Sequence, residues 1–282
     1  ALIGDDNLPF ENAGVLKTTG FELQAKWSDK LSNGFAYSVG VALSDDKAEV
    51  LSYPSNPTNK IGDGVLYKGY TVGDIWGYET GGILQESDFD GVGPNGKPLY
   101  HGAYFKGGQP YPGYVWYQDL DHDGVITSGL STVDDPGDKK VIGNNAPRYR
   151  YNITANFQYK GFDLDLMFQG VGKRDYWLKD VSSYWGGGAG SWETYNQSWT
   201  PERTDAKFPM YGSGIGSYAQ SGYLLDASYI KLKQVILGYT FPKALIGKVG
   251  LKKLRLNIAA YNLFTLSDVP KYYDSDYLSD AY

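Results

Sequence analysis

The chain has 282 residues, of which 37 are glycine and 26 tyrosine, so its composition favours turns and strands and predicts an all-β protein. The absence of cysteine excludes disulfide scaffolds, thiolate nucleophiles and cysteine-based metal sites. With only two histidines, the chain also has little to build a histidine metal cluster from. A net charge of −6 without a basic stripe argues against nucleic-acid binding, and no apolar run is long enough for a membrane helix.

The first predicted strand pair lies near the start of the chain. Apolar and polar residues alternate through 15–28 and again through 34–45, and Asn33-Gly34 between them is a typical hairpin-turn signal. Glu22 and Lys26 share the polar face of the first strand. We therefore predict two antiparallel strands, each with one apolar and one polar face.

A calcium-loop pattern lies in the long segment 46–147. Asp119, Asp121 and Asp123 recur at alternate positions, Gly124 follows directly, and Val125 offers its backbone carbonyl. Leu130 stands where the loop normally has a bidentate glutamate, and Asp134, Asp135 or Asp138 could supply that ligand if the loop is enlarged. The predicted calcium ligands are Asp119, Asp121, Asp123, Val125 and Asp135. The alternative interpretation is an Asp-Gly turn held by side-chain to backbone hydrogen bonds.

The clearest alternation runs through 148–159 and resumes through 162–171. Lys160-Gly161 separates the two runs and predicts a two-residue turn. That turn places Tyr159 opposite Phe162 and makes the two apolar faces coincide. Asp163 and Asp165 then lie on the polar face, which also carries the Asn and Gln side chains of the preceding strand.

The last predicted pair covers 228–241 and 254–264, after a second long segment at 172–227. Lys231 and Lys233 share the parity of the apolar residues of their strand, which is tolerable only near a membrane rim. Short turns thus alternate with long connections. This sidedness is typical of outer-membrane barrels, which have short periplasmic turns and long extracellular loops. A half-buried sheet in a soluble protein has the same alternation and remains the alternative.

Several ordered blocks of the chain resemble the C-terminal barrel region of the SusC/RagA family of TonB-dependent outer-membrane transporters. The blocks are VLKTTGFELQAKW (15–27), GDIWGYETGGILQ (73–85), YQDLDHDGVI (117–126) and the segments 141–175, 198–210, 224–245 and 254–268. The resemblance implies a transmembrane antiparallel barrel of 22 strands, a plug domain, a SusD-like surface lipoprotein as a lid, and TonB-energised import of glycans or peptides. Six strands are too few to close a barrel, so we expect residues 1–282 to be its C-terminal portion, with the plug domain and the TonB-contacting parts outside this chain.

Most tryptophans fall outside the predicted strands. They are Trp76, Trp116, Trp177, Trp185, Trp192 and Trp199. Such rings can stack on sugars or build small cores within long loops, and we favour the second interpretation. No ligand-binding residue is predicted from them.

Catalysis has little support in the sequence. His101 and His122 lie in Gly- and Asp-rich segments without a nucleophile motif, so we predict that the protein is not an enzyme. The predicted function is that of wall and loops in an outer-membrane nutrient importer, with outer-membrane lipid, a SusD-like lipoprotein, TonB and a glycan or peptide substrate as partners. The alternative is a secreted, soluble β-rich module that binds glycans.

Overall fold

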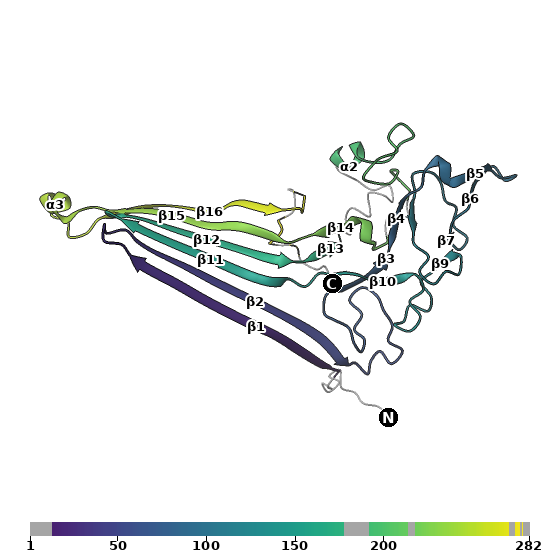
Figure 1. Ribbon diagram of the computed structural model, residues 1–282, viewed down its shortest axis with the longest axis horizontal. Helices are drawn as coiled ribbons and strands as arrows, with labels where there is room; N and C mark the ends of the chain where they lie inside the picture. Colours follow the sequence, from purple (N-terminus) through teal and green to yellow (C-terminus); the bar gives the residue numbers. More distant parts are fainter. Residues whose placement is uncertain (1–12, 178–191, 214–217, 271–273, 277, 279–282) are drawn as a thin grey trace, which may run out of the picture.

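The computed structural model describes residues 13–177, 192–213, 218–270, 274–276 and 278, and these are mostly strand with very little helix. Its main feature is a six-stranded antiparallel sheet with the order β1-β2-β11-β12-β15-β16 (Figure 1). The strands are β1 (Val15–Lys30), β2 (Ala36–Ser52), β11 (Arg148–Tyr159), β12 (Phe162–Lys173), β15 (Tyr229–Thr240) and β16 (Arg255–Ser267). All six lie where the alternation predicts strands.

The central hairpin has the predicted register. Tyr159 lies opposite Phe162, and the pairing continues to Ile153 opposite Phe168. Lys160 and Gly161 both have positive φ, 48° and 90°, as a two-residue hairpin turn requires. The apolar faces of β11 and β12 therefore coincide, which confirms the prediction.

The pairing of all six strands produces rows of like residues across the sheet. One row near the middle is apolar throughout and consists of Ala25, Val41, Ile153, Phe168, Leu232 and Phe264. The neighbouring row on the opposite face consists of Gln24, Ala42, Asn152, Gln169, Lys231 and Thr265. The sheet thus has one apolar face and one polar face along its whole width.

The predicted parity of Lys231 was wrong. A bulge between Leu232 and Gln234 leaves Lys233 out of the pairing, and it changes the phase of β15. Lys231 consequently lies opposite Gln169 on the polar face, while Leu232 lies opposite Phe168 on the apolar face. A single extra residue has this effect because side chains alternate with a period of two.

β2 extends much further than the alternation indicates. β2 continues seven residues beyond the predicted end at 45, and Val15 at the start of β1 pairs with Ser52 at its end. Asp45 and Asp46 interrupt the apolar pattern, but the ladder continues through them because backbone pairing does not depend on side-chain polarity. The short connection after β15 carries α3 (Lys243–Ile246) and η4 (Gly247–Val249).

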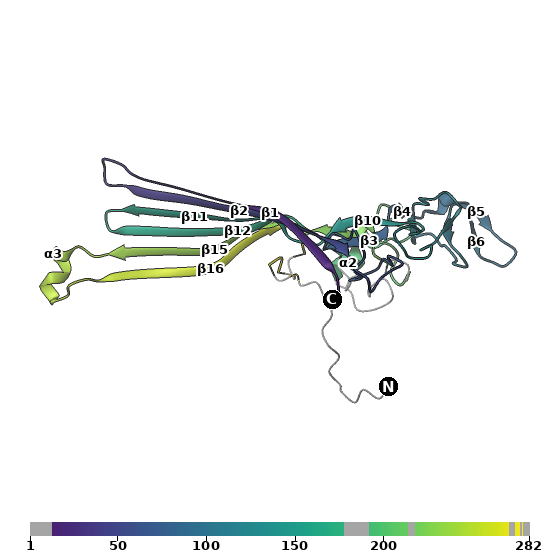
Figure 2. The same cartoon turned by 90° about the horizontal axis from the view of Figure 1, so that it is seen from below.

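A set of small elements fills the opposite end of the molecule from α3 (Figures 1 and 2). They form two-stranded ladders and short helices within the two long connections. They are β3 (Asp74–Tyr78), β4 (Thr80–Ile83), η1 (Glu86–Asp88), β5 (Phe89–Val92), β6 (Pro98–Tyr100), β7 (Tyr104–Phe105), β8 (Val115–Tyr117), β9 (Val125–Ile126), β10 (Lys139–Asn144), β13 (Asp175–Trp177), α2 (Trp192–Asn196), η3 (Ser221–Tyr223) and β14 (Leu224–Asp226). β7 and β9 pair in parallel, unlike the other ladders between strands of the described residues.

The buried apolar clusters of the described residues lie at this loop end. One contains Val50 with Tyr67 and Tyr70, and another contains Tyr78, Val115, Tyr117 and Ile126. The sheet itself has large exposed apolar side chains, and Ile258 is 76% exposed. The long connections therefore have cores of their own, whereas the six strands present their apolar face outward.

No helix among the described residues combines the length and the apolar character needed to span a bilayer.

Candidate functional site

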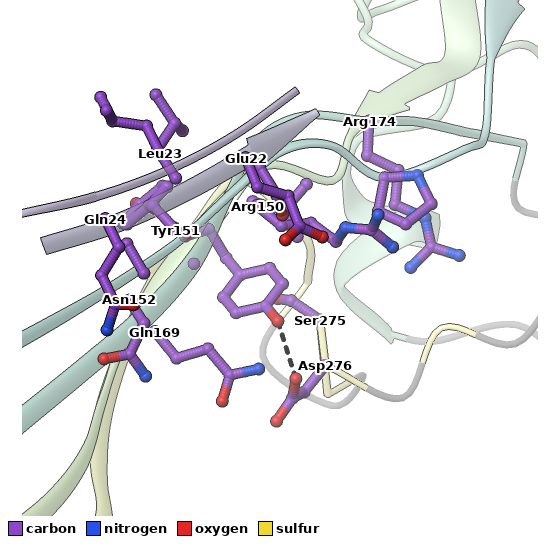
Figure 3. A pocket seen from close by; sticks show the side chains of 17 residues that line it. Glu22, Leu23, Gln24, Arg150, Tyr151, Asn152, Gln169, Arg174, Ser275 and Asp276 are labelled. Carbon is purple, nitrogen blue, oxygen red and sulfur yellow. Dashed lines mark hydrogen bonds between the residues drawn. The ribbon is translucent and has the colours of Figure 1, made fainter. Parts of the chain in front are cut away.

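A cavity of about 820 Å³ lies on the polar face of the sheet, toward the loop end (Figure 3). Glu22 and Gln24 of β1, Asn152 of β11 and Gln169 of β12 line it. Asp276, from beyond β16, also lines it, as do apolar residues such as Ala42 and Val171. Amide side chains both donate and accept hydrogen bonds, so the cavity suits a polar oligomer with many hydrogen-bonding groups.

Two arginine–aspartate pairs connect β11 to β2 beside this cavity. Arg148 Nε and Nη2 donate to the two carboxylate oxygens of Asp45 at 2.5 and 2.6 Å. Arg150, which lines the cavity, pairs with Asp46. Asp45 is 7% exposed, and a bidentate pair at such a position orders both side chains. The pairs therefore hold the rim of the cavity in one arrangement.

The predicted calcium loop brings three carboxylates together. Ligand oxygens of Asp119, Asp121 and Asp138 lie within 4.8 Å of one another. Asp138 is fully buried, and its two oxygens accept backbone N–H groups of Leu120 and Thr127 at 2.7 Å. The Oδ1 atom of Asp119 is buried without a hydrogen-bond partner in the described part of the chain. Oxygen ligands at this spacing suit a hard cation such as Ca²⁺.

The remaining predicted ligands lie outside this trio. Asp123 accepts the N–H of Val125 at 2.8 Å in a turn, and Asp135 lies against Gly129. Asp138 joins the cluster because its N–H donates to the carbonyl of Thr127 at 3.1 Å, which brings it beside the loop. Aspartates 134, 135 and 138 fit the sequence pattern equally well, and only the fold distinguishes them.

The protein shifts the pKa values of two of these carboxyls in opposite directions. Slight burial raises the pKa of Asp119, but backbone N–H groups, of which Gly124 contributes most, outweigh it and hold the pKa below its ordinary value. A hydrogen bond from Asp123 N–H lowers the pKa of Asp121, but slight burial and the neighbouring carboxylates outweigh it, so the net pKa is raised. Opposed shifts are expected where like charges are close.

Two of the loop tryptophans that fall on described residues serve internal packing. Trp76 Nε1 donates to Tyr67 Oη at 2.8 Å, and Trp199, 3% exposed, donates to Gln85 Oε1 at 3.0 Å. These two confirm the prediction that loop aromatics build small cores. Trp192 differs, since it is 75% exposed and stacks on Tyr195. Trp185 lies outside the described residues.

Comparison with known proteins gives a consistent result. No family model matches the chain. It is 28% identical over 273 residues to TonB-dependent receptor P3 of Formosa agariphila, and 25% and 23% identical to receptors P26 and P39 of the same organism. The chain resembles TonB-dependent receptors over more than nine-tenths of its length. This confirms the resemblance seen in the sequence. The matches cover 92–93% of this chain and 25–28% of the receptors, so the chain spans about a quarter of their length.

Solved structures agree with the TonB-dependent receptor resemblance at the level of the fold. The RagAB peptide transporter matches 90% of this chain with a TM-score of 0.66 at 16% identity, and the match covers 26% of that transporter chain. The RagAB peptide importer in its open-open state matches 90% of this chain and 26% of its own, with a TM-score of 0.62 at 18% identity. The proteins found are receptors and transporters rather than enzymes.

Proposed function

We propose that this chain forms part of the wall and the extracellular loops of an outer-membrane nutrient importer of the TonB-dependent type. The observation that carries the proposal is the two-faced sheet, because its apolar face is exposed and its polar face contains the cavity. Among the described residues, β1 pairs only with β2, and β16 only with β15. Further strands of the whole protein, 22 in all in the SusC/RagA arrangement, would cover both edges and close a barrel.

The cargo in this proposal is a glycan or peptide oligomer that passes along the polar face. A SusD-like lipoprotein covers the loop end, and TonB supplies energy through parts of the protein outside this chain. The RagAB structures are those of a peptide transporter, which favours a peptide, while the amide-rich lining fits hydrogen-bonding groups of either cargo.

A labelling experiment on the full-length protein in lipid tests this proposal. Ile258 and Asn257 are neighbours on β16 that point to opposite faces, and this chain has no cysteine of its own. We expect a fluorophore on Ile258→Cys to be quenched by lipids that carry a quencher in their tails, and one on the matched control Asn257→Cys to be quenched by iodide in water. Equal quenching of both positions by iodide alone contradicts the proposal and favours a soluble module.

Isolation of the native complex from outer membranes tests the partners. We expect a surface lipoprotein and a bound oligomer to accompany the full-length protein through purification, and mass spectrometry identifies both. A protein that purifies alone, without lipoprotein or oligomer, contradicts the proposed lid and cargo while leaving the membrane location unaffected.

We also propose that Asp119, Asp121 and Asp138 bind Ca²⁺ and so order the loop that contains them. The buried Oδ1 atom of Asp119, without a partner among described residues, supports this proposal. Calorimetry of the full-length protein is expected to show Ca²⁺ binding that Asp119→Asn abolishes. The control Asp135→Asn alters a predicted ligand outside the trio and is expected to retain binding. No heat of binding at millimolar Ca²⁺ contradicts the proposal.

A further inference from the structure

A few described residues beyond β16 lie at the polar face of the sheet. They are Asp274, Ser275, Asp276 and Leu278, which we call the inner segment. Ser275 is 3% exposed and lines the cavity together with Asp276, as Figure 3 shows. The cavity wall is therefore built partly from strands and partly from Ser275 and Asp276, which lie beyond the last strand.

Two lysines of β15 hold the inner segment by its carboxylates. Lys231 Nζ lies 2.6 Å from Asp274 Oδ1 and 3.3 Å from Asp276 Oδ2, and Lys233 pairs with Asp276. The hydroxyl of Tyr229 donates to Asp276 Oδ1 at 2.7 Å. The Lys231 side chain is 4% exposed, so loss of its aspartates would leave a buried charge without compensation. Two positive and two negative groups balance in this cluster, which favours the folded-back position.

The bulge in β15 makes this arrangement possible. Without it, Lys231 would have the parity of Val235 and would point to the apolar face. The extra residue Lys233 moves Lys231 to the polar face, where both ammonium groups reach Asp276. Bulges commonly redirect side chains in this way.

The far end of the inner segment is held independently. Arg174 Nη2 donates to the carbonyl oxygen of Leu278 at 2.6 Å, and Leu278 packs with Val269 and Ala227 in a buried cluster. Contacts therefore exist on both sides of Ser275. Connecting segments normally run over the protein surface, so a buried serine held between two sets of contacts beside a cavity is unusual for a loop.

We propose that the inner segment is a standing constriction of the passage, held in place by Lys231 and Lys233, and that Asp276 is part of the surface that cargo meets. Its role toward cargo rests on the proposed import function, whereas the position of the segment does not. The constriction limits the width of the cavity at its loop end and so selects for the size of what enters.

The ion pairs between the inner segment and β15 persist over a wide pH range. Burial raises the pKa of Asp276, but Lys233, the Tyr229 hydroxyl and Lys231 outweigh it and bring the pKa down to about 2. Because the pKa of Asp276 is lowered in the folded protein, the ion pairs stabilise it fully at any pH above the ordinary pKa of an aspartate. That stabilisation is lost only as the pH falls through the lowered pKa. The cluster is therefore fully charged at neutral and mildly acidic pH.

Cysteine accessibility in the full-length protein, in isolated outer membranes, tests the position of the inner segment. Ser275→Cys is expected to react with a water-soluble maleimide at least about tenfold more slowly than the exposed reference Ser55→Cys. Adding Lys231→Ala is expected to raise the Ser275→Cys rate about tenfold or more, because one anchor is lost, while Lys231→Arg keeps it slow. The matched control is Arg255→Ala, which breaks the Arg255–Asp163 pair on the same face but away from this cluster.

A second measurement tests the constriction itself. Gln169→Cys lies on the cavity wall opposite Lys231. We expect a small maleimide to label it and a maleimide on a bulky polymer to be excluded, and we expect Lys231→Ala to remove that difference. The proposal is overturned if Lys231→Ala leaves the Ser275→Cys labelling rate unchanged. It is also overturned if the bulky reagent labels Gln169→Cys freely while Lys231 is still present. An unchanged Ser55→Cys rate shows that the reagent reaches each variant equally, and a cooperative urea transition shows that each variant is folded. Failure here leaves lipid quenching at Ile258→Cys unaffected, so the two proposals can be refuted separately.

Discussion

Val41 offers a direct test of what covers the apolar face. It belongs to the central apolar row and is 42% exposed, while its neighbour Ala42 lies in the polar row and lines the cavity. If lipid covers Val41, Val41→Arg is expected to lower the free energy of unfolding by about 2 to 4 kcal/mol, and Ala42→Arg by at most about 1 kcal/mol. Val41→Phe is expected to cost little, because lipid tails adapt to a larger apolar side chain.

A packed protein interior gives a different result for the same variants. There Val41→Phe adds atoms to a close-packed site and is expected to cost about 1 to 3 kcal/mol. The assay is reversible unfolding of the full-length protein in detergent micelles or thin bilayers by urea, followed by tryptophan fluorescence. A Val41→Phe cost as large as that of Val41→Arg, or equal costs for Val41→Arg and Ala42→Arg, refutes the assignment of lipid to the apolar face.

Three further predictions concern single contacts. Gly161→Ala is expected to destabilise the protein by about 1 kcal/mol or more, because φ is +90° and a Cβ would lie 2.7 Å from the Thr240 carbonyl oxygen. Lys160→Asn is expected to stabilise the protein slightly, because Asn adopts positive φ more readily in such a turn. The midpoint of urea unfolding measures both effects. Asp45→Ala is expected to cost about 3 kcal/mol, because it leaves Arg148 partly buried and unpaired, and the same midpoints with Arg148→Ala and the double variant check the coupling. Ca²⁺ affinity measured by calorimetry is expected to fall as pH drops toward the raised pKa of Asp121, because protonation removes a ligand.

The strands were predictable because the information that defines them is local. In β11 and β12, alternation assigns the two faces, and Lys160-Gly161 determines which residues are paired, so the register follows from about twenty consecutive residues. The pairs β1–β2, β11–β12 and β15–β16 follow in the same way, since a short connection joins each, whereas β2–β11 and β12–β15 become neighbours across the two long connections. The ends of β2 were missed, because the alternation stops at Asp45 while the backbone ladder continues.

The cluster of three carboxylates shows the limit of a motif. The pattern from Asp119 to Gly124 contains two of its members, because their spacing is built into the loop. The third member depends on which of three later aspartates the fold returns to the loop. That choice is made by the hydrogen bond from Asp138 N–H to the Thr127 carbonyl, a contact that spacing alone does not reveal.

The position of the inner segment could not be predicted from local sequence patterns, because it depends on contacts between residues far apart in the chain. Its aspartates and the lysines of β15 are more than forty residues apart, and their meeting requires the bulge at Lys233. A regular strand would place Lys231 among lipid-facing side chains, where an ammonium group is costly, so the sequence appears inconsistent with a membrane strand until the bulge is known. The local conflict disappears once β15 changes phase. The two lysines that interrupt an otherwise regular alternation are the residues that hold another part of the chain inside the cavity.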